Sequence, residues 1–240
     1  MRTALVTGAN SGIGFAVVTR FLAEGHKVIA HVREGLGDLE GIQDGSQLEI
    51  VRGDLSDIES VSQMTSDPKV QGVDILVNNA GAYVFRDDFE SIVVKEVEHL
   101  LRVNVIAPMI LCQAVIPIMI ERGWGRIVNV SSVSVSHGGA ARTIDYTFSK
   151  SALESMTWTL SKSLAPKNVL VNAIRVGVTD TKIHQLNPTK NLEDRIRTIP
   201  IGRMADPEEI AETAMYLASD GSGYMTGQNL LVDAGWTLVG

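Results

Sequence analysis

Short apolar runs alternate with longer amphipathic stretches over most of the 240 residues. We expect strands at residues 3–6, 27–32, 48–52, 73–77, 126–130, 169–174 and 228–232, and helices at 15–25, 58–66, 95–122, about 146–165 and 207–219. The predicted strands are apolar on both faces, which is typical of a parallel sheet covered by helices on both sides. The sequence therefore predicts a three-layer, doubly wound α/β fold around a single, mostly parallel seven-stranded sheet.

Composition limits the functions that such a fold can have. With 45% hydrophobic and 20% charged residues, the chain suits one domain over residues 1–240. A formal charge of −7 without a Lys/Arg-rich run argues against binding to nucleic acid or to an anionic membrane. The lone Cys112 excludes an internal disulfide, and no metal-binding cluster is visible. Because no signal peptide and no apolar run of membrane-spanning length is recognised, we expect a cytoplasmic protein.

A glycine-rich turn joins the first predicted strand to the first predicted helix. It contains Gly8, Gly12 and Gly14. Glycines let the backbone approach a pyrophosphate, and a helix N-terminus offers free N–H groups and the positive end of a dipole. The pattern indicates a phosphate cradle, and the alternative is a tight β–α connection that binds no ligand.

Tyr146 and Lys150 stand four residues apart in a predicted helix. This spacing places both side chains on one helix face. A cation beside a phenol stabilises the phenolate and lowers its pKa, so Tyr146 can exchange a proton with an alcohol or carbonyl oxygen. The alternative is a chance pair on a solvated helix face.

Small and polar residues stand at the carboxyl ends of other predicted strands, where parallel sheets bind ligands. Asp54 follows the third strand, residues 78–81 end the fourth, and Ser131 and Ser132 end the fifth. These positions place a serine hydroxyl where the Tyr146 helix begins. A polar segment at about 179–203 is long for a connection, which suggests a substrate loop.

The predicted helix 95–122 is apolar on nearly all sides. We expect one side to meet the sheet and another to meet a second subunit. Pro108 and Pro117 should bend it, and the amide of Asn104, surrounded by apolar residues, must find hydrogen-bond partners.

Taken together, these motifs resemble those of the classical short-chain dehydrogenase/reductases, and the likeness covers the whole chain. It is carried by Thr7-Gly8-Ala9-Asn10-Ser11-Gly12-Ile13-Gly14, Asn78-Asn79-Ala80-Gly81, Asn104, Ser132, Tyr146 with Lys150, and the segment from Val169 to Gly177. Within the family the chain looks most like 3-oxoacyl-[acyl-carrier-protein] reductase-type members. The resemblance implies a Rossmann fold, a homotetramer and an NAD(P)(H)-dependent oxidoreductase that transfers a hydride between the nicotinamide and a carbonyl or secondary alcohol.

The resemblance also assigns roles to residues. Tyr146 would transfer the proton, and Ser132, with Ser131 as its rival, would hydrogen-bond the substrate oxygen. Lys150 would hold the nicotinamide ribose and lower the Tyr146 pKa, and Asn104 would help to order a relay water. The expected cofactor contacts are Gly8, Asn10, Ser11, Gly12, Ile13, Gly14, Arg33, Asp54, Leu55, Asn79, Ala80, Gly81, Tyr146, Lys150, Gly177, Thr179 and Thr181.

Some positions depart from the family pattern. Val176 replaces the proline that usually precedes the glycine at 177, and the segment between the second and third strands is short. Carrier-protein reductases use basic residues near the ends of two long helices. Lys167 fits one such position and only Arg122 lies beside the other, which leaves docking of an acyl carrier protein open.

The end of the second strand bears on the choice of cofactor. NADH-preferring enzymes usually place a carboxylate there, whereas a 2′-phosphate needs a cation. Here the position is Val32, followed by Arg33 and then Glu34. We therefore favour NADP(H), with NAD(H) as the alternative.

Two other functions were weighed against the oxidoreductase. An isomerase or lyase of the extended branch of the family normally has a longer carboxyl-terminal substrate region than this chain provides. A catalytically silent nucleotide-sensing regulator would be suggested by loss of Tyr146 or Lys150, and both residues are present.

Overall fold

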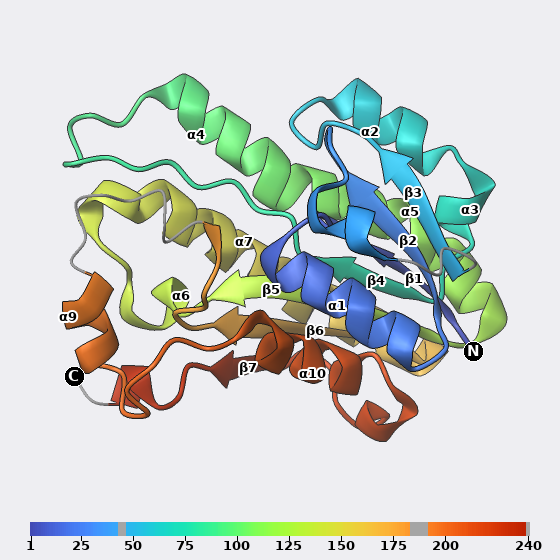
Figure 1. Cartoon of the computed structure of the whole chain (residues 1–240). Coiled ribbons are helices and arrows are strands. Elements are labelled where there is room, and N and C mark those ends of the chain that lie inside the picture. Colours follow the sequence, from blue (N-terminus) through green and yellow to red (C-terminus); the bar gives the residue numbers. More distant parts are fainter. Residues whose placement is uncertain (43–46, 183–191, 239–240) are drawn as a thin grey trace.

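The computed structural model describes residues 1–42, 47–182 and 192–238. Seven strands form one sheet in the order β3-β2-β1-β4-β5-β6-β7, and all neighbouring strands are parallel (Figure 1). The strands are β1 (Thr3–Val6), β2 (Lys27–Val32), β3 (Leu48–Arg52), β4 (Ile75–Asn78), β5 (Gly125–Ser132), β6 (Val169–Val176) and β7 (Asn229–Val232). The predicted α/β fold is confirmed, with a sheet that is wholly rather than mostly parallel.

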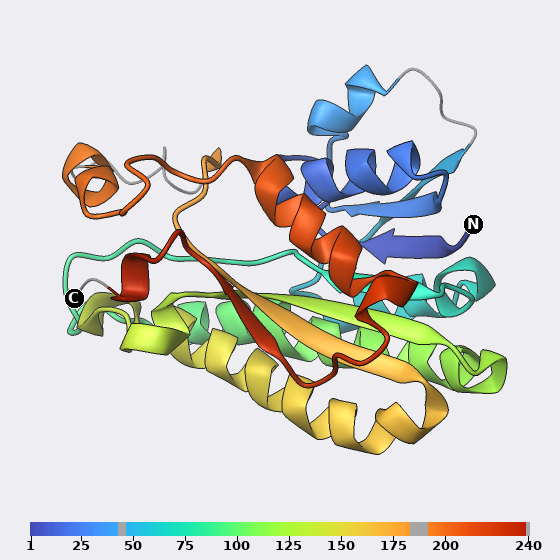
Figure 2. The ribbon, with the colours of Figure 1, turned by 90° about the horizontal axis from the view of Figure 1, so that it is seen from below.

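Helices cover both faces of the sheet (Figure 2). α1 (Gly12–Ala23) and α10 (Pro207–Leu217) lie on one face, and α5 (Ala107–Arg122) and α7 (Ile144–Leu164) lie on the other. The other helical elements are α2 (Ile58–Thr65), α3 (Pro68–Gln71), α4 (Val94–Leu101), α6 (Ser134–His137), α9 (Leu192–Arg197), η1 (Gly37–Gly41), η3 (Arg102–Ile106), η4 (Ala141–Thr143), η5 (Ala165–Lys167), η6 (Asp220–Ser222) and η7 (Trp236–Leu238).

Each face of the sheet has its own apolar core. On one face Phe21 of α1 packs with Ile210 of α10, and on the other Leu111 and Met119 of α5 pack against the strands. All four side chains are fully buried, and each burial stabilises the fold by about 1.5–3 kcal/mol. The two cores explain why the strands are apolar on both faces.

The chain reverses its direction of travel through the sheet between β1 and β4. β2 and β3 extend the sheet on one side of β1, and β4 to β7 extend it on the other. In doubly wound sheets a crevice opens at the carboxyl ends of the strands at this switch point. The segments that follow β1 and β4 therefore form the walls of a ligand site.

The predicted helix 95–122 is instead three elements: α4, the π-helical turn η3 and α5. In η3 the N–H of Ala107 donates to the carbonyl of Arg102, five residues back. Pro108 begins the first turn of α5 and has no N–H, so it cannot complete the ordinary bond to the Asn104 carbonyl. A wider turn at this point places Asn104 inside a π-helical segment, which is frequent at functional sites.

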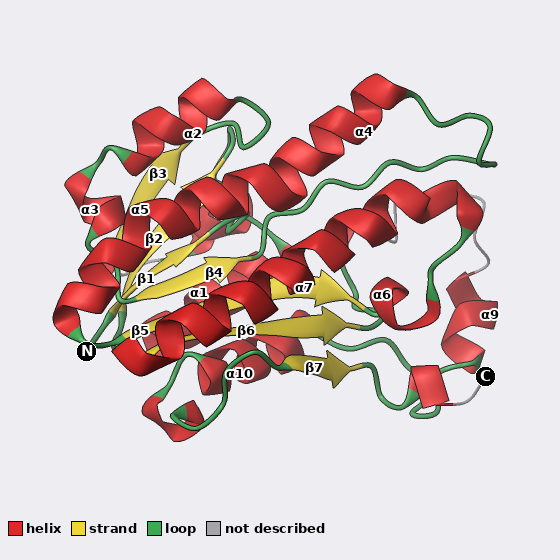
Figure 3. Cartoon of the chain, turned by 180° about the vertical axis from the view of Figure 1, so that it is seen from behind, coloured by secondary structure: helices red, strands yellow, loops and turns green. Residues whose placement is uncertain are grey.

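The stretch Val94–Arg122 is long and apolar enough to cross a membrane, with a mean hydropathy of 2.1 over an 18-residue window. The expectation that no apolar run reaches this length is therefore wrong. Only the length and composition of this stretch suggest a membrane span. Its packing does not, because Leu111, Val115 and Met119 are completely buried against the sheet. Figure 3 shows α5 lying beside α7 across this face, as a core helix does.

Other boundaries differ from the predictions by a few residues. β5 and β6 continue to Ser132 and Val176, two residues beyond the predicted ends, because they pair with each other along their whole lengths. Asp57 caps α2 by accepting a 3.0 Å hydrogen bond from the Glu59 N–H. Of the predicted substrate loop, residues 183–191 lie outside the described residues.

Candidate active site

The glycine turn after β1 lies against the segment that follows β4. Gly8 has a φ of +63°, and a Cβ there would lie 2.9 Å from the Ala80 Cα. A Cβ on Gly14 would overlap the Gly8 carbonyl oxygen. The Thr7 hydroxyl accepts 3.0 Å hydrogen bonds from the N–H groups of Asn79 and Ala80. Close approach of the two segments therefore requires glycine at both positions.

The N-terminus of α1 is suited to an anion. Its N-cap Ser11 makes no side-chain hydrogen bond to the helix, and its first turn contains no acidic residue. The first N–H groups are thus available to a ligand, and the helix dipole favours negative charge. This arrangement fits the pyrophosphate of a dinucleotide.

A cavity of about 820 Å³ runs from the glycine turn across the carboxyl ends of the strands. It brings together Ser132 and every residue that the sequence assigned to the cofactor. Those residues are Gly8, Asn10, Ser11, Gly12, Ile13, Gly14, Arg33, Asp54, Leu55, Asn79, Ala80, Gly81, Tyr146, Lys150, Gly177, Thr179 and Thr181. Asn104 is not part of the lining and lies behind it.

The end of the cavity near β2 and β3 carries charged side chains. Arg33 and Glu34 are both largely exposed, with Nε and Oε1 3.5 Å apart. The Asp54 carboxylate turns inward and accepts bonds of 2.8 and 2.7 Å from the N–H and hydroxyl of Ser56, which lower its pKa. Asp54 is therefore ionised and already bonded, and the Arg33 guanidinium, which pairs with the exposed Glu34, also helps to lower the Asp54 pKa.

His31 in β2 was missed by the sequence analysis. Its Nδ1 accepts a 3.3 Å bond from the Gly8 N–H, and its Nε2 donates a 2.9 Å bond to the Gly53 carbonyl in the tautomer that satisfies both contacts. Burial lowers the pKa of His31, so the ring is neutral at pH 7. The residue ties the glycine turn to the end of β3. In the sequence, the sign that pointed to His31 was a polar residue within an otherwise apolar predicted strand.

The three predicted catalytic side chains on β5 and α7 meet in the cavity. The Lys150 Nζ lies 5.8 Å from the centroid of the Tyr146 ring and donates a 2.8 Å hydrogen bond to the Val130 carbonyl. The Ser132 side chain hydrogen-bonds that of Tyr146. The four-residue spacing of Tyr146 and Lys150, with Ser132 at the end of β5, thus brings a hydroxyl, a phenol and an ammonium together in the cavity.

Burial controls the charge of this group. It raises the pKa of Tyr146 to about 12, against the opposing effect of the Ser132 hydrogen bond. It also lowers the pKa of Lys150 to about 8. The sequence analysis expected Lys150 to lower the Tyr146 pKa, but the net shift is upward, and the Lys150 ammonium donates to the Val130 carbonyl. Tyr146 is therefore a protonated phenol at neutral pH, which is the form that donates a proton.

Ser131, the rival of Ser132, is committed elsewhere. Its hydroxyl donates a 2.6 Å bond to the fully buried Glu154 of α7. Glu154 also accepts bonds of 2.9 and 2.6 Å from Arg175 of β6 and one of 2.7 Å from Asn229 of β7. This network fastens three strands to α7, and it leaves Ser132 as the hydroxyl that contacts Tyr146.

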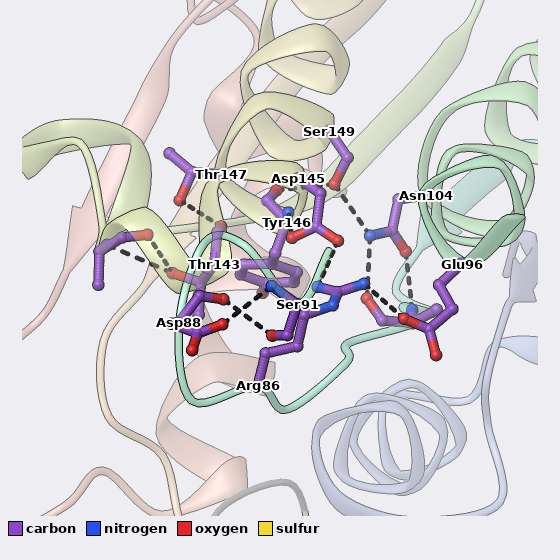
Figure 4. A network of polar contacts seen from close by, with 12 residues as sticks. Arg86, Asp88, Ser91, Glu96, Asn104, Thr143, Asp145, Tyr146, Thr147 and Ser149 are labelled. Atoms are coloured by element: carbon purple, nitrogen blue, oxygen red, sulfur yellow. Dashed lines mark hydrogen bonds and ion pairs between the residues drawn. The ribbon is translucent and has the colours of Figure 1, made fainter. Parts of the chain in front are cut away.

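Asn104 finds the partners that its burial demands. Its Oδ1 accepts a 2.7 Å bond from the Ala82 N–H, and its Nδ2 donates to the Ala82 carbonyl at 3.0 Å and to the Ser149 hydroxyl at 3.0 Å (Figure 4). Ser149 in turn donates to the Tyr146 carbonyl at 2.7 Å. Asn104 therefore holds the segment after β4 and the helix of Tyr146 at a fixed separation.

A buried ion pair beside Tyr146 was also missed. Arg86 donates to Asp145 at 2.7 Å and to Glu96 at 3.0 Å (Figure 4). The side chains of Arg86 and Asp145 are only 3% and 1% exposed. Asp145, directly before Tyr146, was the feature of the sequence that could have indicated this pair. Nothing in the sequence identified Arg86, 59 residues away, as its partner.

The far end of the cavity is aromatic. The Tyr83 ring contacts Tyr146 edge-on, with centroids 4.9 Å apart, and Phe85 packs on Tyr83 at 4.7 Å. His137 of α6 makes a similar edge contact with Trp236 at 5.6 Å. These residues come from the segment after β4, from α6, from α7 and from η7, so no spacing in the sequence could group them.

Comparisons with known proteins agree with this site. A family model described as enoyl-(acyl carrier protein) reductase matches residues 8–237. The 3-oxoacyl-[acyl-carrier-protein] reductase FabG of Thermotoga maritima is 35% identical over 244 residues, which cover 98% of this chain and 97% of that protein.

Two solved structures extend the likeness to the fold. One, from Beutenbergia cavernae, is assigned as an NAD(P)-dependent gluconate 5-dehydrogenase with NADP bound at low occupancy. It has a TM-score of 0.91 at 34% identity and covers 99% of this chain and 97% of its own. The other, 4-hydroxyisoleucine dehydrogenase complexed with NADH, has a TM-score of 0.91 at 28% identity and covers 99% of both chains.

The matches span the glycine turn, Ser132, Tyr146 and Lys150. They join the sequence motifs and the cavity geometry to a known group of enzymes. The chain therefore belongs to the classical short-chain dehydrogenase/reductase family and is an oxidoreductase that acts on CH–OH groups with NAD(P).

Proposed function

We propose that the enzyme reduces a small-molecule carbonyl compound to a secondary alcohol, or catalyses the reverse, with NADP(H) as its favoured cofactor. The observation that carries the proposal is that Ser132, Tyr146 and Lys150 line the same cavity as the glycine turn. When bound, the nicotinamide supplies the hydride. Gly8 to Gly14 and the N-terminus of α1 would hold the pyrophosphate of the cofactor. Gly177, Thr179 and Thr181 line the side of the cavity that follows β6.

Each catalytic residue has a role that fits its surroundings. Tyr146 donates its proton to the substrate oxygen, since its raised pKa keeps the phenol protonated. Ser132 donates a hydrogen bond to the same oxygen as negative charge develops there. Lys150 would hold the cofactor ribose beside the nicotinamide. Its ammonium also stabilises the phenolate that remains on Tyr146 after the proton has been donated.

Asn104 acts from behind the cavity wall. Both donors of its side-chain amide are already used by Ala82 and Ser149. In an ordinary helix the backbone carbonyl of Asn104 would accept a hydrogen bond from the N–H of residue 108, but residue 108 is a proline and has no N–H. We assign that carbonyl the role of holding the relay water that resupplies protons to Lys150 and Tyr146.

The cofactor preference rests on the end of β2. Arg33 lines the cavity there and forms an exposed ion pair with Glu34 at 3.5 Å. A guanidinium pairs well with a phosphate, which supports NADP(H). NAD(H) remains the alternative, because the structures similar to this chain hold NADP in one case and NADH in another.

A 3-oxoacyl thioester is the substrate class suggested by the FabG relative. Delivery of that thioester by an acyl carrier protein has weaker support. Arg122 already donates to the Gly72 carbonyl at 2.7 Å and to Asp74 at 3.0 Å. Lys167, at the end of η5, is the other basic residue proposed for docking.

The quaternary structure and location complete the proposal. We propose a cytoplasmic homotetramer of one domain, residues 1–240, with a substrate loop at about 179–203. Large apolar side chains are exposed on α5, at Met109, and on α7, at Phe148 and Trp158. The two helices lie side by side on one face (Figure 3), which supports their contact with a second subunit.

A screen of NADPH and NADH oxidation against β-ketoacyl thioesters, ketones, sugars and quinones tests this function. We expect saturable turnover with at least one carbonyl class and a higher kcat/KM for NADPH. The absence of turnover with every class, by a folded protein that binds NADPH, would contradict it.

A further inference from the structure

The substrate end of the cavity contains a cation that has no acidic partner among the described residues. Arg195 of α9 lines the cavity and is half-buried. Its guanidinium carbon lies 4.8 Å from the centroid of the Trp236 ring, which fixes it by a cation–π contact. The indole N–H of Trp236 donates a 2.9 Å bond to the Thr198 hydroxyl, so the ring is itself held in place.

Two other arginines with buried partners are neutralised by carboxylates, whereas the buried Arg126 donates to the backbone carbonyls of Gly125, Asn168 and Ser219. Arg86 pairs with Asp145 at 2.7 Å, and Arg175 pairs with Glu154 at 2.6 Å. For Arg195, no carboxylate of residues 1–42, 47–182 or 192–238 forms an ion pair. Burial of this guanidinium lowers its pKa, as expected for a charge that lacks compensation.

Arg195 shares its cavity with the proposed proton donor. Arg195, Tyr83 and Tyr146 all line it, and the Tyr83 ring packs edge-on against Tyr146. The charge of Arg195 also acts on Tyr83. Trp236 and His137 continue the wall beyond Arg195. In Figure 1, α6, α9 and the end of the chain lie together beyond the carboxyl ends of β5, β6 and β7.

The charges along the cavity are unevenly distributed. The described lining residues include two carboxylates, Glu34 and Asp54, and both lie at the β2 and β3 end. The other described lining residues include no carboxylate, although Arg195 and His137 are among them. The protein as a whole carries a formal charge of −7, so this local excess of positive charge is not a general property of its surface.

We propose that Arg195 binds a carboxylate on the substrate, so that the enzyme acts on an oxo acid and the corresponding hydroxy acid. The substrate carbonyl meets Ser132 and Tyr146 while its carboxylate lies against Arg195, with Tyr83 between them as a wall. This inference rests on the proposed reduction of a carbonyl and specifies its substrate class. It favours a short free acid over a thioester, because the cation stands close to the catalytic tyrosine.

The first test compares oxo acids with their uncharged methyl esters. We would measure NADPH oxidation with 3-oxobutanoate, 4-oxopentanoate and 5-oxohexanoate, and with the methyl ester of each. At least one acid should exceed its ester in kcat/KM by about tenfold or more, the range expected for a charge-assisted hydrogen bond. If every methyl ester has a kcat/KM equal to or higher than that of its acid, the assignment of Arg195 is overturned, while the proposed carbonyl reduction stands.

Variants on α9 identify the residue responsible. Arg195→Met keeps an unbranched side chain against Trp236 and should reduce the acid-to-ester ratio of kcat/KM by about tenfold. Arg195→Lys, which keeps the charge, should recover part of that ratio. The matched control is Arg197→Met, which removes an exposed arginine from the same helix and should not change the ratio. An unchanged ratio in Arg195→Met would contradict the proposal.

A measurement on the unmutated enzyme covers the case in which an α9 variant fails to fold. Butanoate should inhibit reduction of a neutral ketone competitively, and butanamide, which has the same shape without the charge, should not. Equal inhibition by the two would contradict an anion subsite. Acetoacetyl-CoA and the uncharged acetoacetyl-pantetheine form a further arm. If Arg195→Met affects only the CoA ester, the guanidinium recognises a phosphate and the carboxylate assignment is wrong.

Discussion

At the scale of single residues, the main effect in this site is the loss of water around ionisable groups. Tyr146 and Lys150 are moved by burial in opposite directions, the phenol pKa to about 12 and the ammonium pKa to about 8. Both shifts favour the uncharged forms. The pair therefore enters the reaction with a protonated tyrosine and a lysine that titrates near the working pH.

The lowered pKa of Lys150 predicts a pH dependence. Reduction leaves a phenolate on Tyr146, which the Lys150 ammonium stabilises. As the pH rises through about 8, Lys150 loses its proton, and kcat/KM for reduction should fall by about tenfold per pH unit. Lys150→Arg carries a cation at every accessible pH, so its residual activity should lack this limb. A wild-type profile that stays flat to pH 10 would contradict the assignment.

Arg33 should determine the choice of cofactor. Arg33→Ala removes the guanidinium proposed to bind the 2′-phosphate and should raise the KM for NADPH by about tenfold, with little change for NADH. The side chain is 64% exposed, so the effect should weaken at high salt. Equal or higher catalytic efficiency with NADH in the unmutated enzyme would overturn the preference for NADPH.

Local patterns in the sequence pointed to several residues that the structure places around one cavity. The glycine turn, Tyr146 with Lys150, and Ser132 are recognisable from spacing or from position after a strand. His31, Arg86, Tyr83 and Arg195 were missed, because their partners lie on other elements and only the folded chain brings them together. The raised Tyr146 pKa was missed for a similar reason, since the degree of burial is a property of the whole site.

At the scale of elements, α7 is fastened to the segment after β4 at two points. Asn104 bridges Ala82 and Ser149, and Arg86 bridges Asp145 and Glu96 (Figure 4). The Tyr83 ring, which touches Tyr146, stands between these points in the sequence. The segment therefore fixes the position of the catalytic tyrosine as well as the wall of the cavity.

Breaking the ion pair at Arg86 should disturb that position. Arg86→Gln leaves the Asp145 carboxylate buried and unpaired beside Tyr146, which should destabilise the fold by about 3–5 kcal/mol. The remaining charge also raises the pKa of Tyr146. We expect a lower Tm and a lower kcat.

The double variant Arg86→Gln/Asp145→Asn removes both charges and should recover much of the stability and of kcat. Glu96→Gln is the matched control, because Glu96 is the partly exposed partner of the same arginine and should have a small effect. A double variant no better than Arg86→Gln would assign the loss to packing instead of charge.

The π-helical turn η3 shows a limit of pattern reading at this scale. Apolar residues continue through 95–122, so a period of 3.6 predicts one helix. Pro108 marked a disturbance, but the sequence did not distinguish a bend from the wider turn that carries Asn104. The parallel sheet needed no such detail, because strand–helix alternation and strands apolar on both faces were enough to predict it.

At the scale of the whole molecule, the exposed apolar side chains predict assembly. Met109, Phe148 and Trp158 are 43%, 41% and 48% exposed on two adjacent helices. Light scattering should give a tetramer at micromolar concentration, and Trp158→Glu should reduce it to a smaller species. Ile58→Glu on α2, a change of equal character at 45% exposure, should leave the mass unchanged. A stable monomer of the unmutated chain would contradict the prediction.

The central claim is that Tyr146 donates the proton in a reduction that NADPH drives. Its most direct test is Tyr146→Phe, measured by steady-state turnover beside a fluorescence titration with NADPH. The variant keeps the ring that packs on Tyr83 and removes only the hydroxyl. We predict that kcat falls by about 10²–10⁴-fold while the affinity for NADPH changes little. Near-normal turnover by Tyr146→Phe would contradict the account.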